Sequence, residues 1–230
     1  MKIIFIHGSG GSKESWKFQT DYFKDSEAIN LPGHPDGDTC GSIEEYVDWL
    51  KGYIDEKGYK DLVLVGHSLG GGIVLLYALK YPGDLKGIVP LGSGTRLRVH
   101  PDFLEALRKM VSQPDSYKDF KTQESNLIPP DMEEIMTRRR LENGPAVMLS
   151  DLEACDRFDI MDRLSDLKTP ALALCGSEDI MTPPKYTKFM ADRLPNCRAV
   201  VIPDGTHMVY VEKPDETNKA IEEFIREISD

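Results

Sequence analysis

Residues 62–76 limit the possible folds more than any other segment, because they predict a buried strand, a tight turn and a helix in direct succession. Residues 62–65, with the sequence LVLV, form a continuous apolar run, typical of a strand covered on both faces. The run passes into Gly66-His67-Ser68-Leu69-Gly70, where glycines suit a turn with little room for side chains. Gly71 and Gly72 then open an apolar helix. A strand that turns directly into a helix is typical of a parallel α/β sheet.

The same alternation of strand and helix extends over most of the chain. Strand-like runs occupy residues 2–6, 62–65, 87–91, 171–175 and 199–202, with a weaker one at 27–30. Helical patterns occupy residues 13–23, 42–56, 69–81, 184–194 and 214–228. We therefore predict an α/β fold with a mainly parallel sheet of about six strands flanked by helices. Ligands of such folds bind at the carboxyl ends of the strands.

Residues 96–150 interrupt this alternation. They contain helix-like segments punctuated by prolines and no strand pattern, which predicts a helical lid inserted between two parts of a core domain, residues 1–95 and 151–230. The lid is rich in Met, Phe and Tyr, and we expect Phe103, Leu104 and Met136 to line an apolar acyl pocket. The run Arg138-Arg139-Arg140 is interpreted as a solvated helix face.

Composition excludes several classes of partner. Against 39 acidic residues there are 28 Lys and Arg, and the net charge of −11 disfavours nucleic acids and anionic membranes. No apolar run approaches the roughly 20 residues that span a bilayer. Four scattered cysteines without C-x-x-C spacing indicate reduced thiols, and a cytoplasmic location is expected. No feature of the sequence indicates an oligomeric state.

The turn after residues 62–65 matches G-x-S-x-G, which makes Ser68 a candidate nucleophile. The alternative is a glycine-rich turn with an incidental serine. The Leu69 N–H at the start of the helix is expected to stabilise an oxyanion, with the Ser9 N–H of His7-Gly8-Ser9-Gly10-Gly11 as the second donor. That loop also resembles a phosphate-binding loop, but it lacks both G-x-G-x-x-G and a G-K-[ST] ending.

A serine needs a base, and sequence order favours one of the five histidines. His207 follows the last strand-like run in a loop from which its ring could reach Ser68. The carboxylate that orients this ring should follow the preceding strand, where Glu178 and Asp179 are adjacent. We expect Asp179 because its side chain is shorter and a Pro183-Pro184 turn follows, with Glu178 as the alternative.

The order Ser, Asp, His and the segments around these residues resemble the α/β-hydrolase superfamily, in particular its small carboxylesterases, lactonases, perhydrolases and carbon–carbon bond hydrolases. The segments that carry the resemblance are HGSGGS, INLPGHPDGD, LVGHSLGGGIVLLYALKYP, LCGSEDIMTPP and IPDGTHMVYVEKPDETNKAIEEFI. The resemblance covers nearly everything outside residues 96–150. It implies that Ser68, Asp179 and His207 form a triad, with Ser9 and Leu69 as oxyanion donors. Because this chain starts at the strand before the oxyanion loop, we expect about six strands, all potentially parallel.

The predicted function is therefore a serine hydrolase that cleaves small carboxylic esters through an acyl-enzyme intermediate, with a small-molecule acyl substrate and without a cofactor or a metal. Acyl transfer, perhydrolysis, lactone hydrolysis and carbon–carbon cleavage with the same triad are the alternatives among enzymes. Outside enzymes, the alternative is a ligand receptor on the same fold. A serine at position 68 argues against haloalkane dehalogenase chemistry, which uses an aspartate nucleophile.

Overall fold

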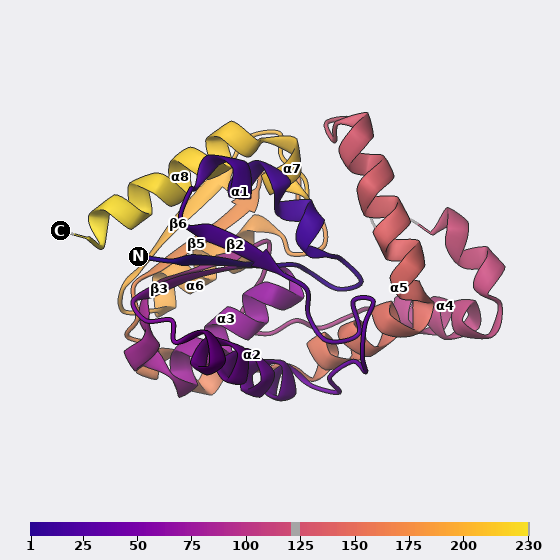
Figure 1. Ribbon diagram of the computed structural model, residues 1–230, viewed down its shortest axis with the longest axis horizontal. Helices are drawn as coiled ribbons and strands as arrows, with labels where there is room; N and C mark the ends of the chain where they lie inside the picture. The colour runs from indigo at the N-terminus through magenta and orange to yellow at the C-terminus, as the bar shows by residue number, and fades with distance from the viewer. Residues whose placement is uncertain (121–124, 230) are drawn as a thin grey trace.

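Six parallel strands form one sheet at the centre of the computed structural model, which describes residues 1–120 and 125–229 (Figure 1). Their order across the sheet is β2-β1-β3-β4-β5-β6, and every neighbouring pair is parallel. The strands are β1 (Ile3–Ile6), β2 (Ser26–Ile29), β3 (Leu62–His67), β4 (Leu85–Leu91), β5 (Ala171–Gly176) and β6 (Cys197–Ile202). The predicted six-stranded parallel α/β fold is confirmed.

Helices connect the strands at the positions that the sequence predicted. The α-helices are α1 (Lys17–Tyr22), α2 (Ile43–Lys57), α3 (Leu69–Lys80), α4 (Pro101–Ser112), α5 (Pro130–Arg157), α6 (Pro184–Arg193), α7 (Val209–Glu212) and α8 (Pro214–Glu227). Short 3₁₀ helices are η1 (Lys13–Trp16), η2 (Pro82–Asp84), η3 (Pro114–Asp119) and η4 (Met161–Asp166). Ser42 caps the start of α2, because its side chain accepts a hydrogen bond from the Glu45 N–H.

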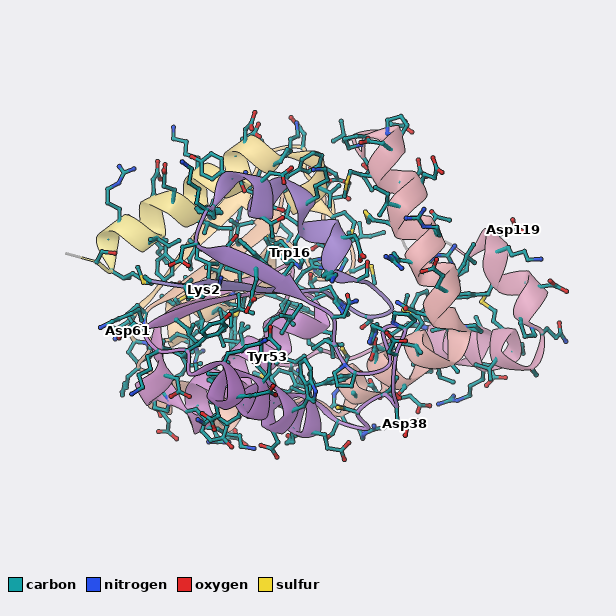
Figure 2. All side chains as sticks on the ribbon, in the orientation of Figure 1. Lys2, Trp16, Asp38, Tyr53, Asp61 and Asp119 are labelled. Carbon is teal, nitrogen blue, oxygen red and sulfur yellow. The ribbon has the colours of Figure 1, made fainter. Side chains whose placement is uncertain are left out.

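Apolar clusters cover both faces of the sheet, because successive side chains of a strand point to opposite faces. Ile4 and Leu64 pack in the cluster beneath α2, α3 and α6. Phe5 and Val65 pack in the cluster on the other face, beneath α1 and α8. Trp16, labelled in Figure 2, lies fully buried in that second cluster. Burial on both sides explains why the strands are continuous apolar runs.

Helices α4 and α5 and the short η3 project beyond one side of the sheet (Figure 1). Asp119, at the end of η3, lies at the outer limit of this region, opposite Lys2 and Asp61 (Figure 2). Arg96 and Asp159 form an antiparallel bridge where the chain leaves and returns. The expected boundary at Ser150 lies within α5, which continues to Arg157.

A kink divides α5 into two parts. Gly144 has φ of +80°, a conformation that favours glycine, and Pro145 follows it. Helix α5 contacts both α3 and η1. Ala154 and Cys155 of its second part pack in the cluster that contains α3, and Arg139 of its first part pairs with Glu14 of η1. Residues 121–124 of the expected lid lie outside the described residues. A division into a core of residues 1–95 and 151–230 and a lid of residues 96–150 stays a proposal.

Candidate active site

Ser68 occupies a strained turn between β3 and α3. Its φ and ψ are +52° and −112°, a backbone conformation that side chains other than glycine rarely adopt. The turn is held because the Ser68 N–H donates to the Leu91 carbonyl at 2.9 Å, and Ser93 Oγ donates to the Ser68 carbonyl at 2.8 Å. A Cβ at position 66 would lie 2.0 Å from the Gly70 carbonyl oxygen, so this turn requires glycine. The geometry presents Ser68 at the carboxyl edge of the sheet.

Asp179 and His207 come together although 28 residues separate them. His207 Nδ1 lies 2.9 Å from Asp179 Oδ2, and both side chains are buried. Asp179 Oδ1 accepts hydrogen bonds from the Met181 and Thr182 N–H groups at 2.9 and 2.8 Å, and the Thr182 hydroxyl donates to Oδ2 at 2.8 Å. Glu178, the alternative carboxylate, is exposed and accepts from Ser177 Oγ. The structure thus places Asp179 beside His207.

The environment of Asp179 favours its charged form. Burial alone raises the pKa of this carboxyl, but the hydrogen bond and charge of His207 and the bonds from Thr182 outweigh burial and lower the pKa below its ordinary value. A carboxylate in this position can orient the His207 ring and stabilise an imidazolium.

Contacts from two sides fix the segment that carries His207. The His207 carbonyl oxygen lies 2.9 Å from His67 Nε2, and the centres of the two imidazole rings lie 4.6 Å apart. Glu212, at the end of α7, accepts hydrogen bonds from both the N–H and the hydroxyl of Thr206. The His67 ring is fully buried, and burial followed by the charge of His207 holds its pKa well below the ordinary value. His67 is therefore a neutral support for the His207 backbone.

Ser68 and His207 line one cavity of about 460 Å³ between the sheet edge and the helices α4 and α5. Phe103 and Met136 line it as well, as does Phe120. Leu104 does not, and the expectation that it contacts substrate is wrong. It is buried among α4, η3 and α5, in a cluster with Leu107, Tyr117, Phe120, Met148 and Leu152, and of these Phe120, Met148 and Leu152 also line the cavity.

Of the two expected oxyanion donors, Ser9 lines the cavity and Leu69 directly follows the cavity-lining Ser68. Gly8 and Gly10 line the cavity together with Ser9, and Leu69 is the first residue of α3. In residues 1–120 and 125–229, neither the Ser9 N–H nor the Leu69 N–H has a hydrogen-bond acceptor. Two amides without internal partners beside Ser68 can stabilise negative charge on a substrate oxygen.

The cavity also contains residues that the sequence analysis did not single out. Met148, Tyr210 and Arg140 line it, and Arg140 corrects the interpretation of residues 138–140 as a solvated face. The Arg140 guanidinium lies 4.6 Å from the centre of the Tyr117 ring and donates to the Tyr117 and Lys118 carbonyls. Three consecutive arginines carry no sequence signal that distinguishes the one facing inward.

The described residues contain no group of three or more His, Cys, Asp or Glu side chains that could hold a metal ion. All four cysteines are free, as expected from their spacing. Within residues 1–120 and 125–229, the helices are too short or too polar to cross a membrane.

The fold agrees with comparisons to known proteins. The profile of the alpha/beta hydrolase family matches residues 3–220. The chain belongs to the alpha/beta hydrolase family and is an enzyme of that family, which confirms the resemblance found in the sequence.

Three relatives illustrate the range of this family. The chain is 25% identical to (E)-2-((N-methylformamido)methylene)succinate hydrolase of Acinetobacter baylyi, over 97% of this chain and 89% of that protein. It is 26% identical to pimeloyl-(acyl-carrier protein) methyl ester esterase of Neisseria meningitidis, over 100% of this chain and 78% of that protein. A solved structure of a thermophilic esterase is 33% identical, with a TM-score of 0.81, and the match covers 99% of this chain and 90% of that one.

Proposed function

We propose that this enzyme hydrolyses small carboxylic esters, with Ser68, His207 and Asp179 as its catalytic triad. The observation that carries the proposal is the buried His207–Asp179 pair, 2.9 Å apart, at a cavity whose wall also contains Ser68 on its strained turn. The similarity to two esterases supports the ester as the scissile group.

The proposed reaction has two steps. His207 accepts the proton of the Ser68 hydroxyl as its oxygen attacks the ester carbonyl, and the Ser9 and Leu69 N–H groups stabilise the resulting oxyanion. His207 then protonates the departing alkoxide, which leaves an acyl group on Ser68. Water, deprotonated by His207, attacks this acyl-enzyme and releases the carboxylic acid. The Asp179 carboxylate keeps the imidazole in the required tautomer and stabilises its charged form.

A panel of p-nitrophenyl esters of increasing chain length, with lactones and thioesters beside them, tests the reaction class. The Ser68→Ala variant should lose up to about 10⁶-fold in kcat while the fold remains intact. An enzyme that acylates with these esters but transfers the acyl group to an alcohol or peroxide in preference to water would support acyl transfer or perhydrolysis. If wild-type enzyme turns over none of the panel, the carbon–carbon hydrolase and receptor alternatives replace the proposal.

A substrate with a carboxylate on its acyl part is the second element of the proposal. Arg140 lines the cavity and, among the described residues, has no carboxylate partner, because its guanidinium donates only to carbonyls. Lys118 adds a second positive charge, whereas Glu133 is the only acidic residue in the described cavity wall. The relative named as a succinate hydrolase supports an anionic substrate.

A matched pair of substrates tests this element. The methyl monoester of a dicarboxylic acid and the methyl ester of the corresponding monocarboxylic acid differ only in one charge. We expect a higher kcat/KM for the monoester of the dicarboxylic acid, and Arg140→Met should remove that preference. Equal kcat/KM values for both esters would exclude the anionic subsite.

A cytoplasmic location is part of the same proposal, since such reactions need no export.

A further inference from the structure

A second buried pair of histidine and aspartate lies outside the cavity. His34 Nε2 and Asp151 Oδ2 are 2.9 Å apart, and neither side chain has any exposed surface. His34 belongs to the loop between β2 and α2, and Asp151 belongs to the second part of α5. Neither residue lines the cavity, so the reaction does not use them directly.

Hydrogen-bond geometry assigns the charges of this pair. Both His34 nitrogens face oxygens, since Nδ1 lies 2.9 Å from the Pro32 carbonyl and Nε2 lies 2.9 Å from Asp151. With Asp151 as a carboxylate, which can only accept, both contacts are hydrogen bonds only if both His34 nitrogens carry protons. His7, whose ring lies 4.7 Å away, has one nitrogen beside the Gly8 carbonyl and the other accepting from the Leu31 N–H, which defines a neutral ring. The pair is therefore a buried imidazolium and carboxylate.

Asp151 also accepts hydrogen bonds from α2 and from residues 8–11, which we call the oxyanion loop. Its Oδ2 accepts from the Gly10 N–H at 2.8 Å, and its Oδ1 accepts from the Tyr46 hydroxyl at 2.6 Å. Asn143, at the kink of the same helix α5, donates to the carbonyls of Gly10 and Gly11 at 3.0 and 2.7 Å. Two side chains of α5 thus bind the N–H and the carbonyl of Gly10, the residue that follows Ser9.

We propose that Asp151 is a positioning residue that fixes the oxyanion loop, so that the Ser9 N–H points at the developing negative charge. The inference rests on the proposed function, because it assumes a tetrahedral oxyanion at Ser68. Gly10 has φ of +61° and is tied on its N–H by Asp151 and on its carbonyl by Asn143. Preorganised donors stabilise a transition state because they need no reorientation during the reaction. Asp151 provides that preorganisation from outside the cavity.

The isosteric variant Asp151→Asn tests the proposal. Asp151 Oδ2 faces both the Gly10 N–H and His34 Nε2, and Oδ1 faces the Tyr46 hydroxyl. In Asp151→Asn either the NH₂ group faces the Gly10 N–H, or an uncharged amide oxygen replaces the carboxylate there, so the bond that holds the oxyanion loop is lost or weakened. Removal of an oxyanion donor costs about 10²–10³-fold in kcat, and a displaced donor should cost roughly 10-fold to 100-fold. KM for a p-nitrophenyl ester should change less than about 2-fold, since the loop acts on the transition state. Glu153→Gln, which removes a surface carboxylate from the same helix, is the control and should retain wild-type kcat.

A readout specific to the oxyanion separates positioning from general loosening. A trifluoromethyl ketone forms a tetrahedral adduct with a reactive serine, and its inhibition constant should rise by the same factor by which kcat falls. The inhibition constant of the carboxylic acid product should stay unchanged. If Asp151→Asn does not fold, Asn143→Ala is measured instead, and we expect the same pattern with a several-fold loss of kcat.

Unchanged kcat and unchanged trifluoromethyl ketone affinity in the folded variants would overturn the positioning role. An increase of KM and of both inhibition constants together would also overturn it, because that pattern indicates a disordered cavity. Failure of the proposed function looks different, since wild-type enzyme itself would then neither hydrolyse the esters nor bind the ketone.

Discussion

Rings of two buried histidines, His7 and His34, lie 4.7 Å apart, and one is neutral while the other is protonated. His7 donates to a backbone carbonyl and accepts from a backbone N–H, whereas His34 donates to a carbonyl and to Asp151. Because the two rings differ in charge, they affect the pH dependence of stability in opposite directions.

We expect His7 to make the protein less stable in acid. Burial, followed by the charge of His34, lowers the pKa of His7 from 6.5 to about 3. The unfolded chain therefore binds one more proton than the folded chain between these two values, and stability is full above about pH 6.5 and falls as pH decreases. For one proton the slope is at most about 1.4 kcal/mol per pH unit. Urea unfolding of wild type and His7→Gln between pH 7.5 and 5 should show a smaller slope in the variant.

The control for this prediction is His100→Gln, which replaces an exposed histidine of the region around α4. The change in the pH slope caused by His7→Gln is compared with the change caused by this substitution of an exposed histidine. A His7→Gln variant with the wild-type slope would show that His7 does not bind a proton on unfolding.

His34 should stabilise the fold most at low pH. Burial alone lowers its pKa, but the hydrogen bond and charge of Asp151 outweigh burial and raise the pKa above 6.5. A raised pKa gives stability that is full below the unfolded value and is lost as pH rises through the folded value. The loss of unfolding free energy caused by His34→Gln should therefore be larger at pH 6 than at pH 9. Thermal unfolding at both pH values measures this difference, and equal losses would contradict the charged pair.

Asp179→Asn should lower kcat by about 10⁴-fold without unfolding the protein, because an amide favours the wrong tautomer of the base. Glu178→Gln should retain nearly wild-type kcat, since the Glu178 side chain is exposed whereas that of Asp179 is buried beside His207. Steady-state kinetics with a p-nitrophenyl ester compares the two neighbours directly. The reverse order of losses would assign the orienting role to Glu178.

Two adjacent residues of α4 should give opposite phenotypes. Leu104→Ala removes a buried side chain from the cluster between α4 and α5, and it should cost about 2–4 kcal/mol of unfolding free energy. Phe103 lines the cavity, so Phe103→Ala should raise KM instead. Chemical denaturation and steady-state kinetics of both variants distinguish the two positions. A raised KM for Leu104→Ala with unchanged stability would restore Leu104 to the substrate pocket.

Local patterns explain how much of this enzyme was predictable. The continuous apolar runs and the glycines around Ser68 depend on neighbours in the sequence, so the six strands and the turn that carries Ser68 followed from the sequence. The choice of Asp179 over Glu178 rested on the shorter side chain of Asp179. In the structure, the N–H groups of Met181 and Thr182 hold the Asp179 carboxylate.

Contacts between distant segments were not predictable. The bond from the Gly10 N–H to Asp151 joins residues 141 positions apart, and no spacing rule indicates it. Which residues of α4 and α5 face the cavity depends on how these helices pack against each other, and this packing turned Leu104 inward and Arg140 toward the cavity. The continuation of α5 from the expected lid to Arg157 was likewise not indicated by any local pattern.

The nucleophile is the central claim, and covalent labelling tests it most directly. Wild-type enzyme is treated with a fluorophosphonate, digested, and the modified peptide is sequenced by mass spectrometry. The account predicts one phosphonyl group per chain, on Ser68, with ester hydrolysis lost in proportion to labelling and no labelling of Ser68→Ala. A label on another residue, or full ester hydrolysis by a chain whose Ser68 is modified, would contradict it.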